Sequence, residues 1–332
     1  MKYRKLGSSE IEVSTVALGG WALATDTTWG EQGGRDSRAT IDAAQDLGIN
    51  FIDTAEGYAK GASEEVIGRA LKGRRDRFVV ATKAARQNLA PDALVRACEV
   101  SLNGLQIDTI DLYQLHWPDP EVPVEDTLGA LQGLRDEGKI RAYGVCNFGR
   151  DNLTGLLRAG DGVVSNQLAY SLLARAIEYE VQPLCSDHGI GILCYSPLAQ
   201  GLLTGKFRTA DDVPPGRART RHFSHERPQT RHGEGGCEEE TFQAVEAVRA
   251  ICGELGHPME EVALGWLLAQ PGVASVLAGA RNPEQLKKNA RAAGLELEPS
   301  VLEQRARVTE SVKSALGANP DLWMPAEKAR MR

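Results

Sequence analysis

The sequence predicts an α/β fold of the (β/α)8 TIM-barrel type with an N-terminal β-hairpin. Short aliphatic or β-branched runs alternate with longer segments of helical periodicity, which is the pattern of parallel βα units. Eight such runs can be counted after a short pair of strand-like segments at the N-terminus. A length of 332 residues suits one large barrel, because barrels commonly exceed the size of ordinary domains. We therefore expect residues 1–332 to form a single barrel domain.

The expected barrel strands are short and rich in Val, Ile and Leu. In chain order they are Thr15–Leu18, Asn50–Asp53, Phe78–Thr82, Ile110–Leu115, Ala142–Val145, Gly162–Asn166, Gly191–Tyr195 and Ala274–Leu277. Before them, Tyr3–Val13 contains two short strand-like segments around Gly7-Ser8-Ser9. We expect this hairpin to lie across one end of the barrel.

Segments with helical spacing separate these strands. They include Ser37–Leu47, Pro91–Leu105, Val124–Glu137, Ile177–His188, Glu240–Leu255, Val262–Gln270 and Pro283–Ala293. Residues 204–238 have no such period and contain Pro214-Pro215 and many arginines, so they predict a long loop, which is usually a functional lid or disordered. A linker between two domains is the competing interpretation, and the complete set of βα units argues against it.

Composition narrows the class of protein. The net charge of −7 and pI of about 5.5 oppose attraction to nucleic acid and to anionic membranes. No apolar run approaches the roughly 20 residues that span a bilayer. Six cysteines occur without a C-x-x-C pair, which favours reduced thiols over disulfides or a zinc site. These features predict a cytoplasmic protein that binds a small molecule, and a homo-oligomer is compatible with them.

Polar residues stand where several expected strands end. Asp53 ends the second strand and Tyr58 follows in its loop, Lys83 ends the third, and His116 follows the fourth. Loops at the carboxyl ends of barrel strands surround one shared cavity, so these four side chains should meet there. In isolation each has an ordinary structural interpretation, such as a strand-end ion pair or a hydrogen bond.

The combination suits reduction of a carbonyl group. A ketone or aldehyde that accepts hydride needs a proton donor beside its oxygen and groups that stabilise negative charge there. Tyr58 can donate the proton if Lys83 lowers the pKa of its phenol, and Asp53 can keep Lys83 charged. His116 can orient the carbonyl by a hydrogen bond.

These residues resemble the aldo-keto reductase family, in which an Asp, Tyr, Lys and His tetrad occupies these strand ends. The resemblance covers nearly the whole chain. Its motifs are D-T-A-E-G-Y at 53–58, S-E-E-V-I-G at 63–68, A-T-K at 81–83, D-L-Y-Q-L-H-W-P at 111–118 and G-V-C-N-F at 144–148. It implies an NADPH-dependent oxidoreductase whose cofactor site is not a Rossmann fold, and the chain indeed has no G-x-G-x-x-G after a strand.

The resemblance also assigns the cofactor site. It implies that Asn147 and Gln167 bind the nicotinamide carboxamide, that Tyr195 stacks on its ring, and that Arg281 at a helix N-terminus holds the 2′-phosphate, which favours NADPH over NADH. The complete expected cofactor set is Gly20, Trp21, Asp53, Asn147, Gln167, Tyr195, Ser196, Leu198, Gln200, Gly201, Lys206, Gly279, Arg281, Gln285 and Asn289. Arg217 or Arg219 could also fold over the phosphates, or could belong to a solvated loop.

The aromatic residues Trp21, Trp29, Trp117, Phe148 and Trp323 are consistent with an apolar pocket for a small carbonyl or sugar substrate, and Trp29, Trp117 and Phe148 are assigned to that pocket. Two departures from the family pattern are Cys146, where many relatives have a serine that helps to bind the carboxamide, and Ala59, where glycine is common. The charged C-terminal residues 327–332 are expected to be a frayed tail.

Other functions remain open at this point. Lys83 could form a Schiff base in an aldolase, and relatives of this fold also serve as NADPH-sensing regulatory subunits with little turnover. The histidines of the 204–238 loop suggest a metal site, but the arginines around them would repel a cation, so none is expected.

Overall fold

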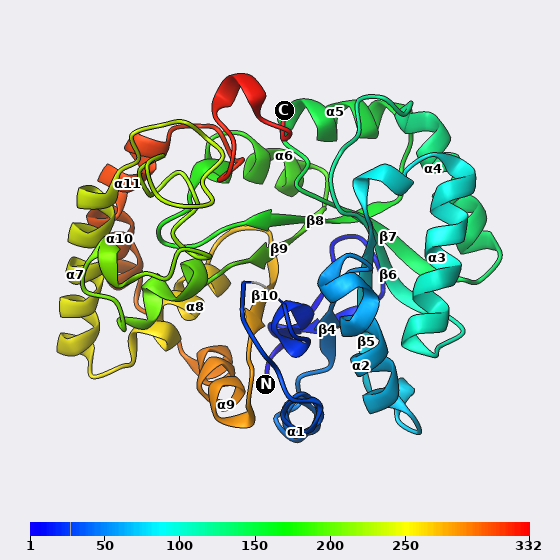
Figure 1. Cartoon of the computed structure of the whole chain (residues 1–332), viewed down its shortest axis with the longest axis horizontal. Coiled ribbons are helices and arrows are strands. Elements are labelled where there is room, and N and C mark those ends of the chain that lie inside the picture. The colour runs from blue at the N-terminus through cyan, green and yellow to red at the C-terminus, as the bar shows by residue number, and fades with distance from the viewer. Residues whose placement is uncertain (27) are drawn as a thin grey trace.

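A closed barrel of eight parallel strands forms the centre of the computed structural model, which describes residues 1–26 and 28–332 (Figure 1). The strands are β3 (Val16–Gly19), β4 (Phe51–Asp53), β5 (Val79–Ala84), β6 (Ile110–Leu115), β7 (Ile140–Cys146), β8 (Val163–Ala169), β9 (Gly191–Tyr195) and β10 (Val273–Gly279). They follow one another in chain order, and β10 closes the ring by pairing with β3. The predicted fold class is therefore confirmed.

Helices surround the barrel on its outer face (Figure 1). They are α1 (Gly34–Asp46), α2 (Ala62–Leu71), α3 (Pro91–Leu105), α4 (Val124–Asp136), α5 (Arg150–Ala159), α6 (Val181–Asp187), α7 (Glu238–Leu255), α8 (Met259–Leu268), α9 (Pro283–Ala290), α10 (Pro299–Val308) and α11 (Glu310–Leu316). The predicted helix Ile177–His188 begins later than expected, at Val181. Pro183 explains this, because a residue without an N–H fits only the first turn of a helix.

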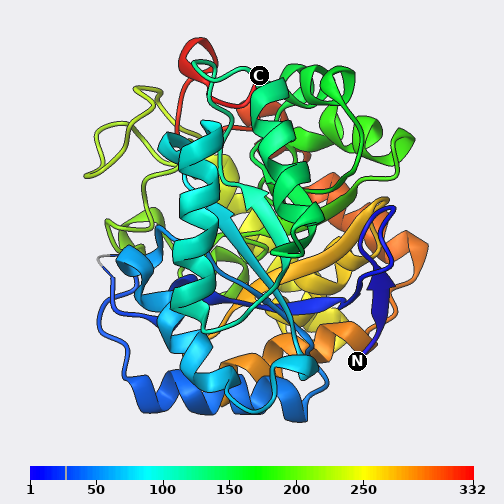
Figure 2. The ribbon, with the colours of Figure 1, turned by 90° about the vertical axis from the view of Figure 1, so that its right-hand side faces the viewer.

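The N-terminal hairpin is formed by β1 (Tyr3–Lys5) and β2 (Glu12–Ser14), which pair antiparallel. Its Leu6 and Val13 are fully buried against the barrel interior. Gly7 has φ +54°, and a Cβ there would lie 2.1 Å from the Val164 carbonyl oxygen, so only glycine fits this close contact. Figure 2 shows the hairpin at the end of the barrel opposite to the 204–238 segment. The hairpin thus closes the bottom and leaves the top open for a site.

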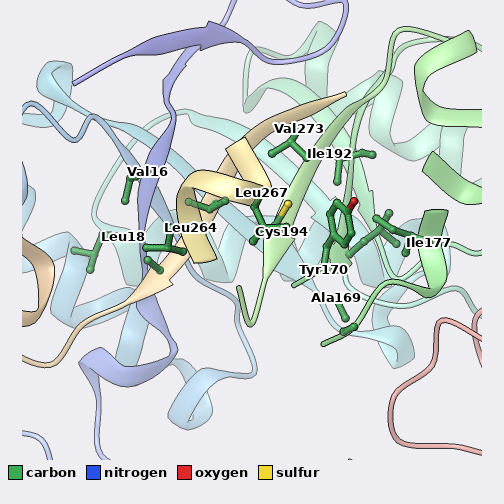
Figure 3. Close-up of a cluster of buried hydrophobic side chains, with 14 of the residues drawn as sticks. Val16, Leu18, Ala169, Tyr170, Ile177, Ile192, Cys194, Leu264, Leu267 and Val273 are labelled. Atoms are coloured by element: carbon green, nitrogen blue, oxygen red, sulfur yellow. The ribbon is translucent and has the colours of Figure 1, made fainter. Parts of the chain in front are cut away.

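Two apolar clusters hold the fold together. The smaller one fills the lower barrel with residues such as Phe51, Leu112 and Leu193. The larger one lies between the strands and the helices, where Leu264 and Leu267 of α8 pack near the barrel strands (Figure 3). Such dense packing fixes the strand ends, which lets them hold side chains in a defined geometry.

Within the described residues, no helix has the combined length and apolar character that crossing a membrane requires. All six cysteines are buried, and each is a free thiol. This agrees with the expectation of reduced thiols.

Candidate active site

A cavity of about 860 Å³ opens at the carboxyl ends of the barrel strands. Most of the expected site residues line it. They are Gly20, Trp21, Trp29, Asp53, Tyr58, His116, Trp117, Asn147, Gln167, Tyr195, Ser196, Leu198, Gln200, Gly201, Lys206, Gly279, Arg281, Gln285 and Asn289. Its volume is in the range of sites for cofactors and drug-sized ligands.

Two expected residues do not reach the cavity surface. Lys83 is completely buried, behind the Tyr58 hydroxyl that it contacts. Phe148 is only 3% exposed and belongs to the core between barrel and helices, so its assignment to the substrate pocket is corrected. It follows Asn147, whose left-handed backbone (φ +63°) redirects the chain where β7 has ended.

The tetrad is assembled around the ammonium group of Lys83. Its Nζ donates to Asp53 Oδ1 at 2.6 Å, to the Thr54 carbonyl oxygen at 2.8 Å and to the Tyr58 hydroxyl at 3.2 Å. β4 supplies Asp53 and the adjacent parallel strand β5 supplies Lys83, which lies two residues beyond Ala81, the register partner of Asp53. A buried ammonium with a carboxylate partner stays charged, so it presents a positive charge to the phenol.

His116 completes the group from the end of β6. Its ring meets the Tyr58 ring edge to face, with centroids 5.9 Å apart and planes at 80°. The Trp21 ring stacks on the Tyr58 ring from another side, with the ring centroids 6.0 Å apart. The phenol is thus held between an indole and an imidazole, and its hydroxyl points to Lys83.

Burial dominates the protonation of this group. It raises the pKa of Tyr58 to about 12, although Lys83 acts in the opposite direction. The sequence-based expectation that Lys83 would give a lowered pKa is therefore corrected. Burial, with the Lys83 charge, lowers the pKa of His116 to about 3. Near neutral pH the site therefore holds a protonated phenol and a neutral imidazole, which are both hydrogen-bond donors.

The buried side-chain amides of Gln167 and Gln114 hydrogen-bond to Asp53 of the tetrad. Gln167 Nε2 donates to Asp53 Oδ2 at 2.8 Å, and Gln114 Nε2 donates to the same oxygen at 3.2 Å. Gln114 was not among the residues expected from the sequence. Its only signal was a polar residue in the strand Ile110–Leu115, two positions before His116.

The expected nicotinamide region is also assembled. Tyr195 donates from its hydroxyl to Asn147 Oδ1 at 2.8 Å, and Asn147 Nδ2 donates to the His116 carbonyl oxygen at 3.0 Å. Cys146 lines the cavity beside them, and burial raises the pKa of its thiol. At this position the chain presents a neutral thiol, which is a weak hydrogen-bond donor.

Several basic side chains and the carboxylate residue Glu260 line the cavity in addition to the tetrad and the nicotinamide region. The following six are cations: Lys206, Arg217, Arg219, Arg231, Arg281 and Lys288. Burial lowers the pKa of Arg217, and the nearby charge of Arg281 lowers it further. Among the described residues, the Nε atoms of Arg217 and Arg219 are buried and have no hydrogen-bond partner.

These groups fit a ligand with several phosphates. Like charges that face one cavity repel each other, and a bound polyanion relieves that repulsion. Ser196 and Gln200 have positive φ angles, and a Cβ on Gly201 would come within 2.9 Å of Lys206 Nζ. The 196–201 loop is thus a tight backbone cradle beside a lysine, and it fits a pyrophosphate.

The C-terminal segment is part of the site, which corrects the expectation of a frayed tail. Arg330 lines the cavity and lies 3.7 Å from the centroid of the Trp117 ring. Its guanidinium donates to both carboxylate oxygens of the fully buried Asp321 at 2.9 Å. Trp323 also lines the cavity, and its ring stacks on the Tyr195 ring with the centroids 6.0 Å apart. Long-range contacts of this kind have no local sequence signal.

The histidine-rich segment has a structural role in this arrangement. His222 is buried, with Nδ1 3.0 Å from the Thr220 hydroxyl and Nε2 2.7 Å from the Leu173 carbonyl oxygen. Burial lowers the pKa of His222 to about 4. Its neutral ring therefore attaches the 204–238 segment to the loop after β8.

The fold and the site together define a barrel oxidoreductase of the type that binds its nicotinamide cofactor at the strand ends. The sequence profile of the Aldo/keto reductase family matches residues 15–310, and the chain belongs to this family. The chain is 38% identical to the aldo-keto reductase YhdN of Bacillus subtilis, over 86% of this chain and 87% of that protein.

Further relatives differ in the function that their names state. An NADH-specific methylglyoxal reductase of Escherichia coli is 36% identical, over 90% of this chain and 95% of that protein. A probable voltage-gated potassium channel subunit beta of Arabidopsis thaliana is 29% identical, over 94% and 97%. Among solved structures, an aldo-keto reductase of Klebsiella pneumoniae in complex with NADPH has a TM-score of 0.74 and 30% identity, over 93% of this chain and 96% of that chain.

Proposed function

We propose that this protein is an NADPH-dependent oxidoreductase that reduces an aldehyde or ketone to the alcohol. The observation that carries the proposal is the contact of the Lys83 ammonium with both Asp53 and the Tyr58 hydroxyl, at 2.6 and 3.2 Å, at the bottom of the cavity. When bound, the nicotinamide cofactor supplies the hydride.

The residues of the chain act on the carbonyl oxygen. Tyr58 donates its proton to that oxygen, and His116 donates a hydrogen bond that positions the carbonyl. Lys83 stabilises the phenolate that remains on Tyr58, and Asp53 keeps Lys83 charged and oriented. Gln114 and Gln167 hold the second oxygen of Asp53, so the carboxylate cannot rotate away from Lys83.

Other residues around the cavity would hold the cofactor. Asn147 and Gln167 would bind the carboxamide, Tyr195 would stack on the nicotinamide ring, and the 196–201 loop with Lys206 would hold the pyrophosphate. Arg281 would pair with the 2′-phosphate. This charged contact supports NADPH over NADH, and the family includes the NADH-specific relative named above as well as the NADPH complex.

The two alternative functions are less well supported. A regulatory subunit that senses NADPH is consistent with the channel-subunit relative, but the complete tetrad favours turnover. An aldolase would need a nucleophilic neutral amine at Lys83. Burial lowers the pKa of Lys83, but the charges of Asp53, Tyr58 and Cys146 and the hydrogen bond to Asp53 together outweigh it, so the pKa is raised and the amine stays protonated.

Composition and the free thiols also support a class of ligand and a cellular location. A small carbonyl or sugar substrate, no nucleic-acid partner and a cytoplasmic location agree with the net charge of −7 and the free thiols. Phe148 is left out of the proposed substrate pocket, which retains Trp29 and Trp117 and gains Trp323.

The test is a titration of cofactor-free protein with NADPH and NADH, followed by a screen of small aldehydes, ketones and sugars for oxidation of NADPH. Quenching of tryptophan fluorescence reports binding. The proposal expects tighter binding of NADPH and turnover of at least one carbonyl class. Binding without turnover of any carbonyl, together with a stable protein partner, would favour the regulatory subunit. Trapping of substrate on Lys83 by borohydride would favour the aldolase.

A further inference from the structure

The Arg281 guanidinium is held by a neighbouring loop. Arg281 lies between β10 and α9, and Gln32 lies in the loop before α1. Gln32 Oε1 accepts from Arg281 Nε at 2.9 Å, and Gln32 Nε2 donates to the Arg281 carbonyl oxygen at 2.9 Å. Gln32 therefore contacts both the side chain and the main chain of the same arginine.

The chemistry of these contacts fixes the orientation of the Gln32 amide. A guanidinium nitrogen only donates and a carbonyl oxygen only accepts, so the reversed amide would lose both hydrogen bonds. The amide is also anchored on the protein interior, because Nε2 lies 3.2 Å from the buried Ser37 hydroxyl, which donates to the Leu23 carbonyl oxygen. Gln32 is thus a rigid support.

The support leaves the positive charge of Arg281 uncompensated. In the described part of the chain, the side-chain hydrogen bonds of Arg281 go to the Gln32 amide oxygen and to the Glu31 carbonyl oxygen, which are both neutral. These bonds use Nε and one N–H of Nη2. Among the residues that the structure describes, none accepts a hydrogen bond from the remaining edge of the guanidinium, and Arg281 lines the cavity.

The main chain at Arg281 is fixed from the other side as well. Its N–H donates to Gln285 Oε1 at 2.9 Å, and the Gln285 N–H donates to Asn282 Oδ1 at 2.9 Å, which caps α9. An arginine that is free in solution loses rotamer freedom when it binds a phosphate, and a side chain that is already held avoids much of that cost.

We propose that Gln32 is a positioning residue that holds Arg281 ready for the 2′-phosphate and so contributes to the choice of NADPH over NADH. This inference rests on the proposed function, since it assigns a further residue to the same cofactor site. Gln32 touches the arginine and acts through it.

The experiment measures dissociation constants of NADPH and NADH by calorimetry for wild type, Gln32→Ala, Arg281→Ala and the double variant. Gln32→Ala should weaken NADPH binding about three- to tenfold and leave NADH binding unchanged, because NADH has no 2′-phosphate. In the Arg281→Ala background the Gln32 substitution should have no further effect.

Two more variants sharpen the test. Gln32→Glu places a carboxylate against the guanidinium, so it should weaken NADPH binding more than Gln32→Ala does. Gln45→Ala is the matched control, because Gln45 Oε1 accepts from Arg74 at 3.0 Å on the exposed side of α1, away from the cavity. It should leave both dissociation constants unchanged.

Equal weakening of both nucleotides, an unchanged NADPH constant in Gln32→Ala, or an additional loss in the Arg281→Ala background would overturn the inference and leave the proposed function standing. If wild type binds neither nucleotide, the proposed function fails and the inference fails with it.

Discussion

Tyr58 is a phenol that keeps its proton near neutral pH, which is the protonation state that a proton donor in carbonyl reduction needs. Burial outweighs the attraction of Lys83, so the pKa of Tyr58 is raised to about 12. A protonated phenol suits reduction, because the alkoxide that forms from the carbonyl takes up the proton. Oxidation of an alcohol would first require the phenolate, which is scarce near neutral pH.

The pH dependence of reduction follows from these values. Tyr58 remains protonated until the pH approaches about 12, and His116, with a pKa of about 3, remains neutral above about pH 4. We therefore expect kcat/KM for reduction to be nearly flat between about pH 5 and pH 10. Measuring initial rates across this range with a stable ketone checks it. A one-proton decrease with a midpoint near pH 7 would show that a different group is the acid.

Lys83 and Asp53 form a buried ion pair, with 2.6 Å between Nζ and Oδ1. Asp53→Asn leaves a fully buried ammonium without its carboxylate, which typically costs about 3–5 kcal/mol. Unfolding by urea should show a loss of this order, and a double variant Asp53→Leu with Lys83→Met should lose much less, because it removes both charges. Equal stability of Asp53→Asn and wild type would mean that Lys83 is not held by Asp53.

At the scale of elements, the sequence predicted the strands and most of the residues that line the cavity, but not the contribution of the last residues of the chain. β6 and β9 have the predicted bounds, because short β-branched runs between helical segments are a local signal. The tetrad also could be predicted, since each member lies at or just after a strand end. Arg330 reaches the cavity from the C-terminal segment, and Gln32 contacts Arg281 from the loop before α1, so no periodicity or spacing marks these two residues.

The C-terminal segment 321–332 provides an element-scale prediction. Arg330→Ala removes the partner of the buried Asp321 carboxylate and the contact on Trp117, which costs about 2 kcal/mol locally because Arg330 is partly exposed. We expect faster proteolysis of this segment and a several-fold higher KM for the carbonyl substrate, with unchanged NADPH affinity.

Lys328→Ala is the control for this prediction, because Lys328 is an exposed residue of the same segment. It should change neither proteolysis nor KM. An Arg330→Ala variant that binds substrate and resists protease like wild type would remove the segment from the substrate pocket.

At the scale of the whole molecule, we propose that residues 1–332 unfold as one domain and that acid weakens it through buried histidines. The pKa of His222 is about 4 in the folded state against an ordinary value of 6.5. Between these values the unfolded chain binds more protons, so stability is complete above about pH 6.5 and is lost as the pH falls towards 4.

We therefore expect fluorescence and circular dichroism to report the same single unfolding transition in urea. The urea concentration at its midpoint should decrease as the pH falls from about 7 to 5. The loss due to His222 is on the order of 3 kcal/mol once the pH is below 4. His222→Gln, which does not titrate, should reduce this dependence. Two separate transitions would contradict the single domain, and an unchanged pH dependence in His222→Gln would contradict the role of His222.

The central claim is that Tyr58 donates the proton in carbonyl reduction. Its most direct test compares wild type and Tyr58→Phe for NADPH binding by fluorescence and for single-turnover oxidation of bound NADPH by a substrate carbonyl. The account predicts unchanged binding and a rate about 10²- to 10⁴-fold lower in the variant. A variant that turns over at the wild-type rate would contradict it and assign the proton to another group.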